Sequence, residues 1–406
     1  MDRISGLSDE TLAKILSFLP TKVAVSTSIL SKRWDRLWLL VPNLDFKDFN
    51  GFEDDEDIFS CSDDEEDTTD INRSKTSRLR YYLNKNLPLH KAPTIDSLRL
   101  SFCRRSARHE DIEEWVGVAV SRCLRELSIY YSSLSGDPDI VLPSSLYTCK
   151  SLVTMKLEGI LILVDVPRKG RLPSLKTLQI RNVTYSKKNT LQRLLSFCPV
   201  LEDLAIEHDS RYGLAIISPS LQRLSLRVDR DCRSDGYVID TPSLKHLIVT
   251  DRRISFSYSI KHMPKLEEAK IVVEDGLSQF LESITSVKRL SLTVFQNNHE
   301  ESMYRAGIVF DHLEHLKFSI CVSYWSKLLV RLLNDAPKLR VLNLSVGHFW
   351  NEGFSWSNER SSVPKCLLKS LETFKFAGYK GKLEERDFLS FLFKNACCLK
   401  SPSILS

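Results

Sequence analysis

A short pattern of hydrophobic positions recurs along most of the chain: an apolar residue, two variable residues, a second apolar residue, one variable residue and a third apolar residue. Its twelve copies are IDSLRL (from Ile95), LRELSI (Leu124), LVTMKL (Leu152), LKTLQI (Leu175), LEDLAI (Leu201), LQRLSL (Leu221), LKHLIV (Leu244), LEEAKI (Leu266), VKRLSL (Val287), LEHLKF (Leu313), LRVLNL (Leu339) and LETFKF (Leu371). On a β-strand the last two apolar positions face the same side and stack on those of neighbouring repeats. The copies start 20 to 32 residues apart, which brackets the period of leucine-rich repeats. The pattern predicts an α/β fold: an irregular leucine-rich-repeat solenoid with a parallel sheet on one face and helices and loops on the other.

The segments between the copies differ in length and pattern. Three of them, Asn189 to Leu201, Ser326 to Leu339 and Glu385 to Leu399, have apolar residues at helical spacing. The copies from Leu201 to Val287 follow one another after only 20 to 23 residues. We therefore expect loops or extended return strands, and little else, between those copies.

The first forty residues have a helical pattern. Ser8 can cap a first helix that Pro20 ends, a second segment runs from Lys22 to Leu30, and Ser31 can cap a third helix. Apolar side chains recur at helical spacing in the first and third segments: Leu12, Ile15, Leu16 and Leu19, then Trp34, Leu37, Trp38 and Val41. A unit this small cannot bury so many apolar side chains by itself. Either the rest of the chain or another protein must cover them.

Composition and charge narrow the class of protein. The 406 residues are 42% hydrophobic and 27% charged, which is typical of a globular chain. The opening residues MDRISGLSDE do not resemble a secretory signal, and the longest apolar run, near residues 159–166, is too short for a bilayer span. The ten cysteines include no C-x-x-C pair. We expect a cytoplasmic or nuclear protein in a reduced compartment.

An acidic segment interrupts the pattern. Residues 53–70 hold eleven acidic side chains and no basic one, so the rest of the chain carries +16 of charge against a net +5. Such a segment is expected to be a disordered linker, placed at residues 47–76. A regulatory role, with Ser62 as a kinase target, is the alternative to a solvated loop.

The N-terminal stretch LSDETLAKILSFLPTKVAVSTSILSKRWDRLW, Leu7 to Trp38, resembles the F-box of plant F-box proteins. This resemblance implies docking on the Skp adaptor of an SCF ubiquitin ligase. The residues it implies for the docked face are Leu7, Ile15, Leu16, Leu19, Pro20, Val23, Leu30 and Trp34. Which of these instead fill the small core stays open, and Ser8 replaces the usual proline of the family. The alternative is a helical cap that seals the next domain.

The C-terminal stretch VPKCLLKSLETFKFAGYKGKLEERDFLSFLFKNACCLK, Val363 to Lys400, resembles the FBD segment of plant F-box and leucine-rich-repeat proteins. Its pattern predicts a strand, a turn at residues 378–381 and an amphipathic helix that close the solenoid. Pro402 interrupts a further copy, so that strand is either an edge strand or missing. The predicted domains are an F-box (1–46), the acidic linker (47–76), the solenoid (77–360) and an FBD cap (361–406).

Side chains between the apolar positions should point outward onto the sheet surface, where such solenoids bind their targets. The candidates for target binding are Lys156, Gln179, Arg181, Arg223, Arg227, His246, Lys270, Arg289, His315 and Lys317. Asp203 beside Arg223 and Glu207 beside Arg227 suggest an alternative, in which some of these charges pair laterally and serve only the sheet.

Motifs of catalysis are missing from the sequence: we find no phosphate-binding glycine loop, H-E-x-x-H, G-x-S-x-G or zinc-spaced cysteine set. His312 and His315 occupy variable positions and are interpreted as surface residues. We therefore predict no enzyme activity, cofactor or metal.

The predicted function is that of a substrate-recognition subunit. Its predicted partners are a Skp adaptor, a cullin bound through that adaptor, and an unknown target protein, and no membrane contact is predicted. The alternatives are a basic solenoid that binds nucleic acid, although its cations are dispersed, or an adaptor-bound scaffold without a ubiquitin ligase role.

Overall fold

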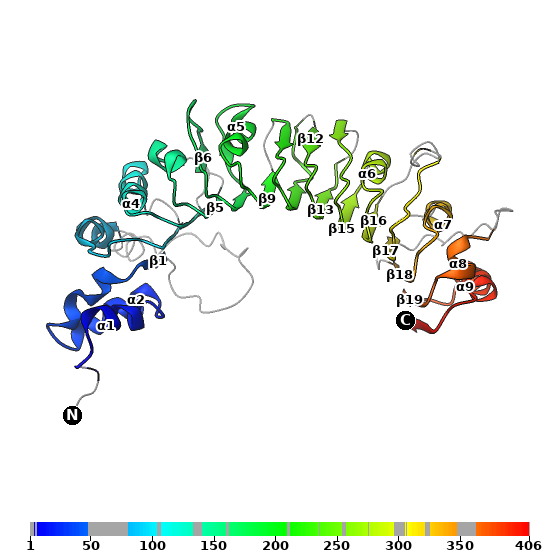
Figure 1. Ribbon diagram of the computed structural model, residues 1–406, viewed down its shortest axis with the longest axis horizontal. Helices are drawn as coiled ribbons and strands as arrows, with labels where there is room; N and C mark the ends of the chain where they lie inside the picture. Colours follow the sequence, from blue (N-terminus) through cyan, green and yellow to red (C-terminus); the bar gives the residue numbers. More distant parts are fainter. Residues whose placement is uncertain are drawn as a thin grey trace, which may run out of the picture. The chain divides into compact units, whose positions relative to one another are not determined.

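The computed structural model describes residues 4, 6–47, 80–103, 107–132, 140–159, 162–208, 212–234, 236–253, 257–274, 276–295, 305, 307–320, 325–346 and 363–405. The acidic segment at residues 53–70, with Ser62, lies outside the described residues. The chain divides into two compact units, Met1–Leu201 and Glu202–Ser406 (Figure 1). None of the described helices is both long and apolar enough to cross a membrane.

The first unit begins with short helical segments. They are α1 (Asp9–Leu16), α2 (Thr21–Ser26) and two 3₁₀ segments, η1 (Thr27–Ile29) and η2 (Trp34–Leu40). Ser8 caps α1 as predicted, because its Oγ accepts a hydrogen bond from Thr11 N at 3.3 Å. The third segment is a 3₁₀ helix without the side-chain cap predicted at Ser31; Trp34 N instead donates to the Ser31 carbonyl at 3.0 Å, an i to i+3 bond.

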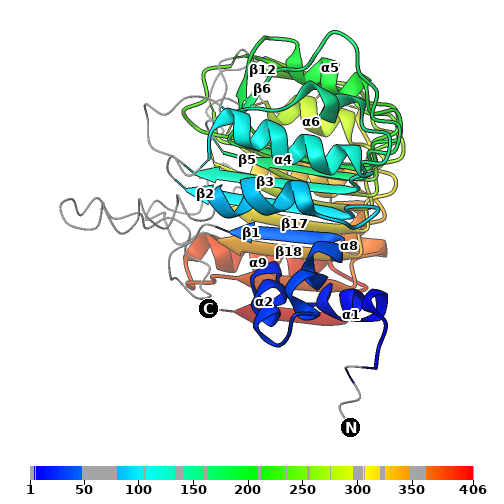
Figure 2. The same ribbon diagram turned by 90° about the vertical axis from the view of Figure 1, so that its left-hand side faces the viewer.

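Five parallel strands and their return segments make up the rest of the first unit. The strands are β1 (Asn43–Lys47), β2 (Ser97–Cys103), β3 (Glu126–Ser132), β5 (Thr154–Glu158) and β7 (Thr177–Arg181). The return segments contain η3 (Leu87–Leu89), α4 (His109–Ser121), η4 (Ser144–Thr148), α5 (Thr190–Ser196) and a small parallel sheet of β4 (Ile140–Val141), β6 (Ile162–Val164) and β8 (Thr184–Tyr185). Both α4 and α5 lie on one side of the five strands (Figures 1 and 2).

Nine parallel strands form the main sheet of the second unit. They are β9 (Asp203–His208), β11 (Arg223–Val228), β13 (His246–Asp251), β15 (Glu268–Val273), β16 (Arg289–Val294), β17 (His315–Ile320), β18 (Val341–Val346), β19 (Thr373–Ala377) and β20 (Ser401–Leu405). The other elements are a three-stranded sheet of β10 (Leu214–Ile217), β12 (Gly236–Asp240) and β14 (Ser257–Ile260), and the helices α6 (Leu277–Ser283), α7 (Trp325–Asp335), α8 (Lys365–Lys369) and α9 (Leu383–Asn395).

Each of the twelve predicted copies forms one strand of these sheets, and the apolar positions form the core. Neighbouring strands pair in register, so Leu224 of β11 lies opposite Leu247 of β13, and Leu247 lies opposite Ala269 of β15. The first apolar residue of every copy, from Ile95 to Leu371, is at most 1% exposed. The stacking that the pattern predicted is therefore confirmed.

The segments between the strands agree with prediction in most places. Helices form in all three segments predicted to be helical, as α5, α7 and α9, and the short repeats return through β10, β12 and β14. One expectation was wrong: α6 fits a seven-residue helix into the short repeat that follows Leu266. Several elements were missed: β1, α4, α8, the helical residues 80–86 and the small sheet of β4, β6 and β8. For β1 and α4 the signal is visible in the sequence. The residues VPNLDF from Val41 repeat the apolar pattern, and Ile112, Trp115, Val116 and Ala119 have helical spacing, so both signals were present.

The C-terminal segment closes the second unit as predicted, with a strand, a turn and a helix. Gly378 (φ +78°) and Gly381 (φ +72°) make the turn, in a backbone region that favours glycine. Phe388 of α9 packs its ring on Phe374, with ring centres 6.2 Å apart. Strand β20 is an edge strand in which Pro402 lies opposite Phe374, so the edge interpretation is confirmed.

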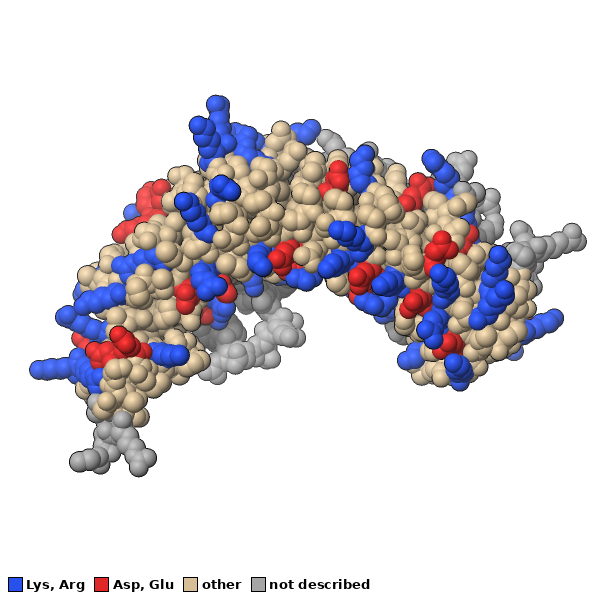
Figure 3. Space-filling view, in the orientation of Figure 1, with Lys and Arg blue, Asp and Glu red and all other residues tan. Residues whose placement is uncertain are grey.

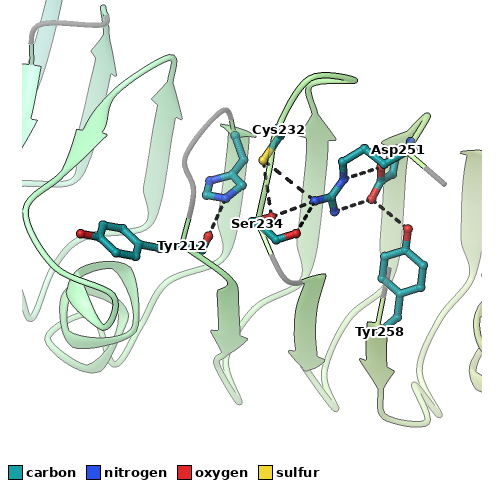
Figure 4. A network of polar contacts seen from close by, with 7 residues as sticks. Tyr212, Cys232, Ser234, Asp251 and Tyr258 are labelled. Atoms are coloured by element: carbon teal, nitrogen blue, oxygen red, sulfur yellow. Dashed lines mark hydrogen bonds and ion pairs between the residues drawn. The ribbon is translucent and has the colours of Figure 1, made fainter. Parts of the chain in front are cut away.

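A buried ion pair lies at the end of β13 in the second unit, where Asp251 is the last residue of the strand (Figure 4). Arg253 and Asp251 have side chains with no exposed surface and are joined by two hydrogen bonds, Nε to Oδ1 at 2.9 Å and Nη2 to Oδ2 at 2.8 Å. Arg253 also donates to the Ser234 hydroxyl at 2.8 Å, and the Tyr258 hydroxyl donates to Asp251 Oδ2 at 3.2 Å. These bonds join the loops that precede β12 and β14 to the end of β13.

Because both charges are buried, removing one should strongly destabilise the second unit. We expect Asp251→Asn to lower the free energy of unfolding by about 3–5 kcal/mol, since it leaves the guanidinium without its counter-charge. The measurement is chemical denaturation of the full chain, with Asp311→Asn in an exposed turn as the control. A loss no larger than that of the control would show that the pair does not stabilise the fold.

Candidate functional site

The N-terminal helices enclose a small hydrophobic core. It is formed by Leu12, Leu16, Ala24, Leu37, Trp38, Leu39 and Val41, with Leu7, Val25, Trp34, Leu40 and Tyr82 packed against it. Tyr82 belongs to the helical residues 80–86, and its ring centre lies 5.6 Å from that of Trp38. The following part of the first unit therefore covers one side of the helices, the side that contains Trp38.

Six large apolar side chains of these helices remain exposed. They are Ile15, Phe18, Leu19, Val23, Ile29 and Leu30, and we call them the exposed apolar set. Ile29 is 88% exposed and Phe18 is 81% exposed. A single exposed apolar side chain is ordinary, but several on one small helical unit mark an interaction surface. From the sequence, either the rest of the chain or another protein must cover the apolar side chains of these helices. The described part of the first unit leaves these six exposed.

The structure divides the eight residues predicted for the adaptor face. Ile15, Leu19, Pro20, Val23 and Leu30 are exposed, Leu7 and Trp34 are half-buried against the core, and Leu16 is 1% exposed within it. Leu16 therefore cannot offer surface to a partner and supports the face from beneath. Phe18 and Ile29 were missed because they lie outside the helical series of the core, although an apolar residue outside that series is itself a signal of exposure.

Polar bonds hold the helices in place. Arg33 pairs with Asp9 at 2.8 Å from Nη2 to Oδ1 and donates to the Leu7 carbonyl, so it ties η2 to the start of α1. Thr21, buried at the start of α2, accepts a hydrogen bond at 2.7 Å from the backbone N of Asp45 in β1. The exposed apolar set is thus carried on a scaffold fixed to the first strand.

A cavity of about 570 Å³ lies where α1 ends and the first strands begin. Its lining combines Phe18 and Leu19 with the charged residues Asp96, Arg99 and Arg125. Because both signs of charge and an apolar rim meet there, the cavity does not favour one class of ligand.

His90 joins the helices to the sheet of the first unit. Its ring is 2% exposed, and Nε2–H donates to the Val41 carbonyl at 2.9 Å. Arg122 lies 3.3 Å from the other ring nitrogen and donates to the His90 carbonyl. The pKa of His90 is lowered to about 4, chiefly by burial; the hydrogen bond to Val41 opposes this shift and the Arg122 cation adds to it. His90 is therefore neutral at physiological pH.

On the sheet of the first unit, three candidates for target binding face outward. Lys156 lies opposite Gln179 in the register of β5 and β7. Arg181 pairs with Glu158 across the same two strands, at 3.8 Å from Nη1 to Oε2. The three residues thus lie on two neighbouring strands, Lys156 and Gln179 at the middle and Arg181 at the end of β7.

On the sheet of the second unit, the other seven candidates lie in rows. Arg223, His246, Arg289 and His315 share one register row, Lys270 and Lys317 share the next, and Arg227 lies in a third. Arg223 pairs with Asp203, Arg227 with Glu207 at 3.4 Å, and Arg289 with Glu268 at 3.0 Å. Lateral pairing, the alternative interpretation of these charges, is thus confirmed for Arg223 and Arg227. Basic and acidic side chains are interspersed on the visible face of the second unit (Figure 3).

Comparison with known proteins identifies similarities over most of the chain. Three family models match it: the F-box domain over residues 4–45, the LRR repeats of FBD-associated F-box protein At5g56370 over residues 112–280, and FBD over residues 358–404. These matches agree with the predicted resemblances at both ends of the chain.

Relatives from Arabidopsis thaliana are similar over the whole length. FBD-associated F-box protein At5g60610 is 50% identical, with 100% of both chains covered. Putative FBD-associated F-box protein At5g56700 is 53% identical, covering 100% of this chain and 98% of the relative. Putative F-box/FBD/LRR-repeat protein At5g62970 is 45% identical, covering 100% of this chain and 93% of the relative.

Acid should weaken the junction formed by His90. The pKa is about 4 in the folded chain against an ordinary 6.5, so between these values the unfolded chain binds more protons. Stability is therefore unaffected above pH 6.5, falls as the pH drops through this window, and is lower by about 2 kcal/mol at pH 5. Denaturation at pH 7 and pH 5 measures this loss.

The variant His90→Gln should lose this part of the pH dependence, because its amide can donate to Val41 without titrating. Exposed His312→Gln is the control, and it should keep the full dependence. Buried His208 also has a pKa of about 4, so some dependence remains in both variants. Equal pH dependence in the two variants would contradict the assignment to His90.

Proposed function

Because the chain belongs to the family of FBD-associated F-box proteins with leucine-rich repeats, we propose that it is the substrate-recognition subunit of an SCF-type ubiquitin ligase. The F-box docks a Skp adaptor, which connects it to a cullin, and the repeats hold the target protein. Seven cysteines among the described residues are free thiols, and free thiols are usual in cytoplasmic and nuclear proteins.

The observation that carries the proposal is the exposed apolar set on helices whose own core is already filled. Leu12, Leu16 and Trp38 are buried in that core, whereas Phe18, Ile29 and Leu30 are 81%, 88% and 64% exposed. Burying an exposed aliphatic or aromatic side chain contributes about 1.5–3 kcal/mol. A few such side chains in the groove of an adaptor would supply most of the free energy of a stable complex.

In this role the chain contributes to rate through proximity. It has no part in bond making: the ubiquitin thioester belongs to other subunits of the ligase. A target held on the repeats presents its lysines close to that thioester, so the transfer becomes effectively intramolecular. The stacked strands form a rigid sheet, and a target bound to a rigid sheet keeps a fixed position relative to it.

Adaptor binding can be tested without damaging the fold. Ile29 and Leu30 are exposed and adjacent, so Ile29→Asp with Leu30→Asp should leave stability nearly unchanged. We expect this double variant to bind a plant Skp adaptor at least about 100-fold more weakly, since two buried aliphatic contacts are replaced by charges. The measurement is co-purification and titration of the full chain with the adaptor.

Lys22→Asp with Lys32→Asp is the matched control, because both lysines are exposed on the same helical unit. The control should bind within a few-fold of the unaltered chain. Unchanged adaptor binding by the apolar variant, or no binding by the unaltered chain, would refute the docking role.

A further inference from the structure

The outward charges on the sheet of the second unit separate into two kinds. Asp203, Glu207 and Glu268 each pair with an arginine of the next strand, as described above. Lys270, Lys317 and Lys375, which we call the lysine row, form no ion pair with the described residues. The paired charges cancel one another, so the lysine row carries the residual positive charge of this surface.

The lysine row has a regular geometry. In the register of the sheet, Lys270 lies opposite Ser291, Ser291 opposite Lys317, Lys317 opposite Asn343 and Asn343 opposite Lys375. The lysines therefore stand on alternate strands, β15, β17 and β19, about 9.6 Å apart. All three are exposed.

No described strand residue facing outward from β16 to β20 is acidic. The outward neighbours of the lysine row are serine, threonine, histidine, valine, alanine and asparagine, together with Ile248 opposite Lys270. One acidic residue also lies beside the row: Glu268 stands two residues before Lys270 on β15, and it is paired with Arg289. Like charges about 10 Å apart repel one another weakly in water, by about 0.4 kcal/mol per pair. An anionic partner would relieve this repulsion, and the carboxylate beside Lys270, that of Glu268, is already paired with Arg289.

Asn343 distinguishes between kinds of anionic partner. Its Oδ1 is buried between Lys317 and Lys375 and has no hydrogen-bond partner among the described residues. A buried polar atom without a partner costs about 1–3 kcal/mol. An N–H or C=O of a peptide bond would satisfy the amide in either orientation, whereas a phosphodiester backbone supplies no donor. The hydroxyls of Ser319 and Ser345, bonded to each other at 3.0 Å, extend this polar strip.

We propose that the lysine row binds an extended peptide whose anionic side chains, carboxylates or phosphate esters, recur at intervals of about 10 Å. A polyproline II segment has three residues per turn and rises 3.1 Å per residue, so every third side chain returns to the same side after about 9.3 Å. This spacing matches alternate strands of the sheet. The inference rests on the proposed function, because the peptide would be a segment of the target protein. The lysine row would then select target proteins that contain an extended anionic segment.

The test uses fluorescent peptides and the full chain with its adaptor. A peptide of repeated Glu-Pro-Pro presents one carboxylate at every third position, and a peptide of the same composition with its glutamates clustered is the comparison. A repeat with phosphoserine in place of glutamate distinguishes phosphate from carboxylate. A single-stranded oligonucleotide of similar length tests nucleic acid.

The variants are matched in charge. Lys270→Gln, Lys317→Gln and Lys375→Gln together remove the lysine row, and Lys261→Gln, Lys338→Gln and Lys369→Gln remove three exposed lysines of turns and α8. We expect the repeated anionic peptides to bind more tightly than the clustered one. Their affinity should fall at least tenfold in the first variant, stay within twofold in the second and decrease with salt.

Equal affinity of both triple variants, or no binding of either anionic repeat, would overturn the proposal. Tighter binding of the oligonucleotide, lost with the lysine row, would also overturn it in favour of nucleic acid. Adaptor co-purification is measured on the same samples. If the adaptor fails to bind while the repeated peptides do, the proposed function falls and the peptide site remains.

Discussion

The fold depends on the parallel stacking of apolar strand residues that no single repeat can bury. Each copy presents three apolar side chains, and residues such as Leu224, Leu247 and Ala269 become buried only because neighbouring strands pair in register. Register is also strict, since a shift by one residue would turn the apolar side chains to the outside. The same constraint makes terminal strands vulnerable. In the first unit the F-box helices are bonded to β1 through Thr21 and Asp45, and in the second unit α9 packs on β19 through Phe388 and Phe374.

This constraint leaves the outward positions free to vary. Four acidic residues there, Glu158, Asp203, Glu207 and Glu268, are paired with arginines of adjacent strands, and these pairs stabilise the sheet itself. Lysines at the middle row have no such partner among the described residues. An array whose core is fixed by leucine can thus change its surface chemistry one strand at a time, without a change of fold.

Sequence periodicity predicted the strands because the core repeats every 20 to 32 residues and each copy contributes the same three positions. It could not separate Leu16, which is buried, from Ile15, which is exposed, because both fit one helical series and only the packing of Trp38 and Tyr82 decides between them. The buried pair of Arg253 and Asp251 was also beyond prediction. Its charged residues stand in an ordinary polar stretch, and their burial depends on loops brought together by the return strands.

Strand β20 has one further consequence, for how the protein behaves at high concentration. An open parallel sheet offers its last strand as a template to which another chain can add. Ile404 and Leu405 are exposed there, which would favour such growth into filaments. Pro402, the second of the five residues of the strand, has no N–H to offer and interrupts the ladder there. The proline thus acts as a terminator, and keeps an array built by repeated addition of strands from continuing into the next molecule.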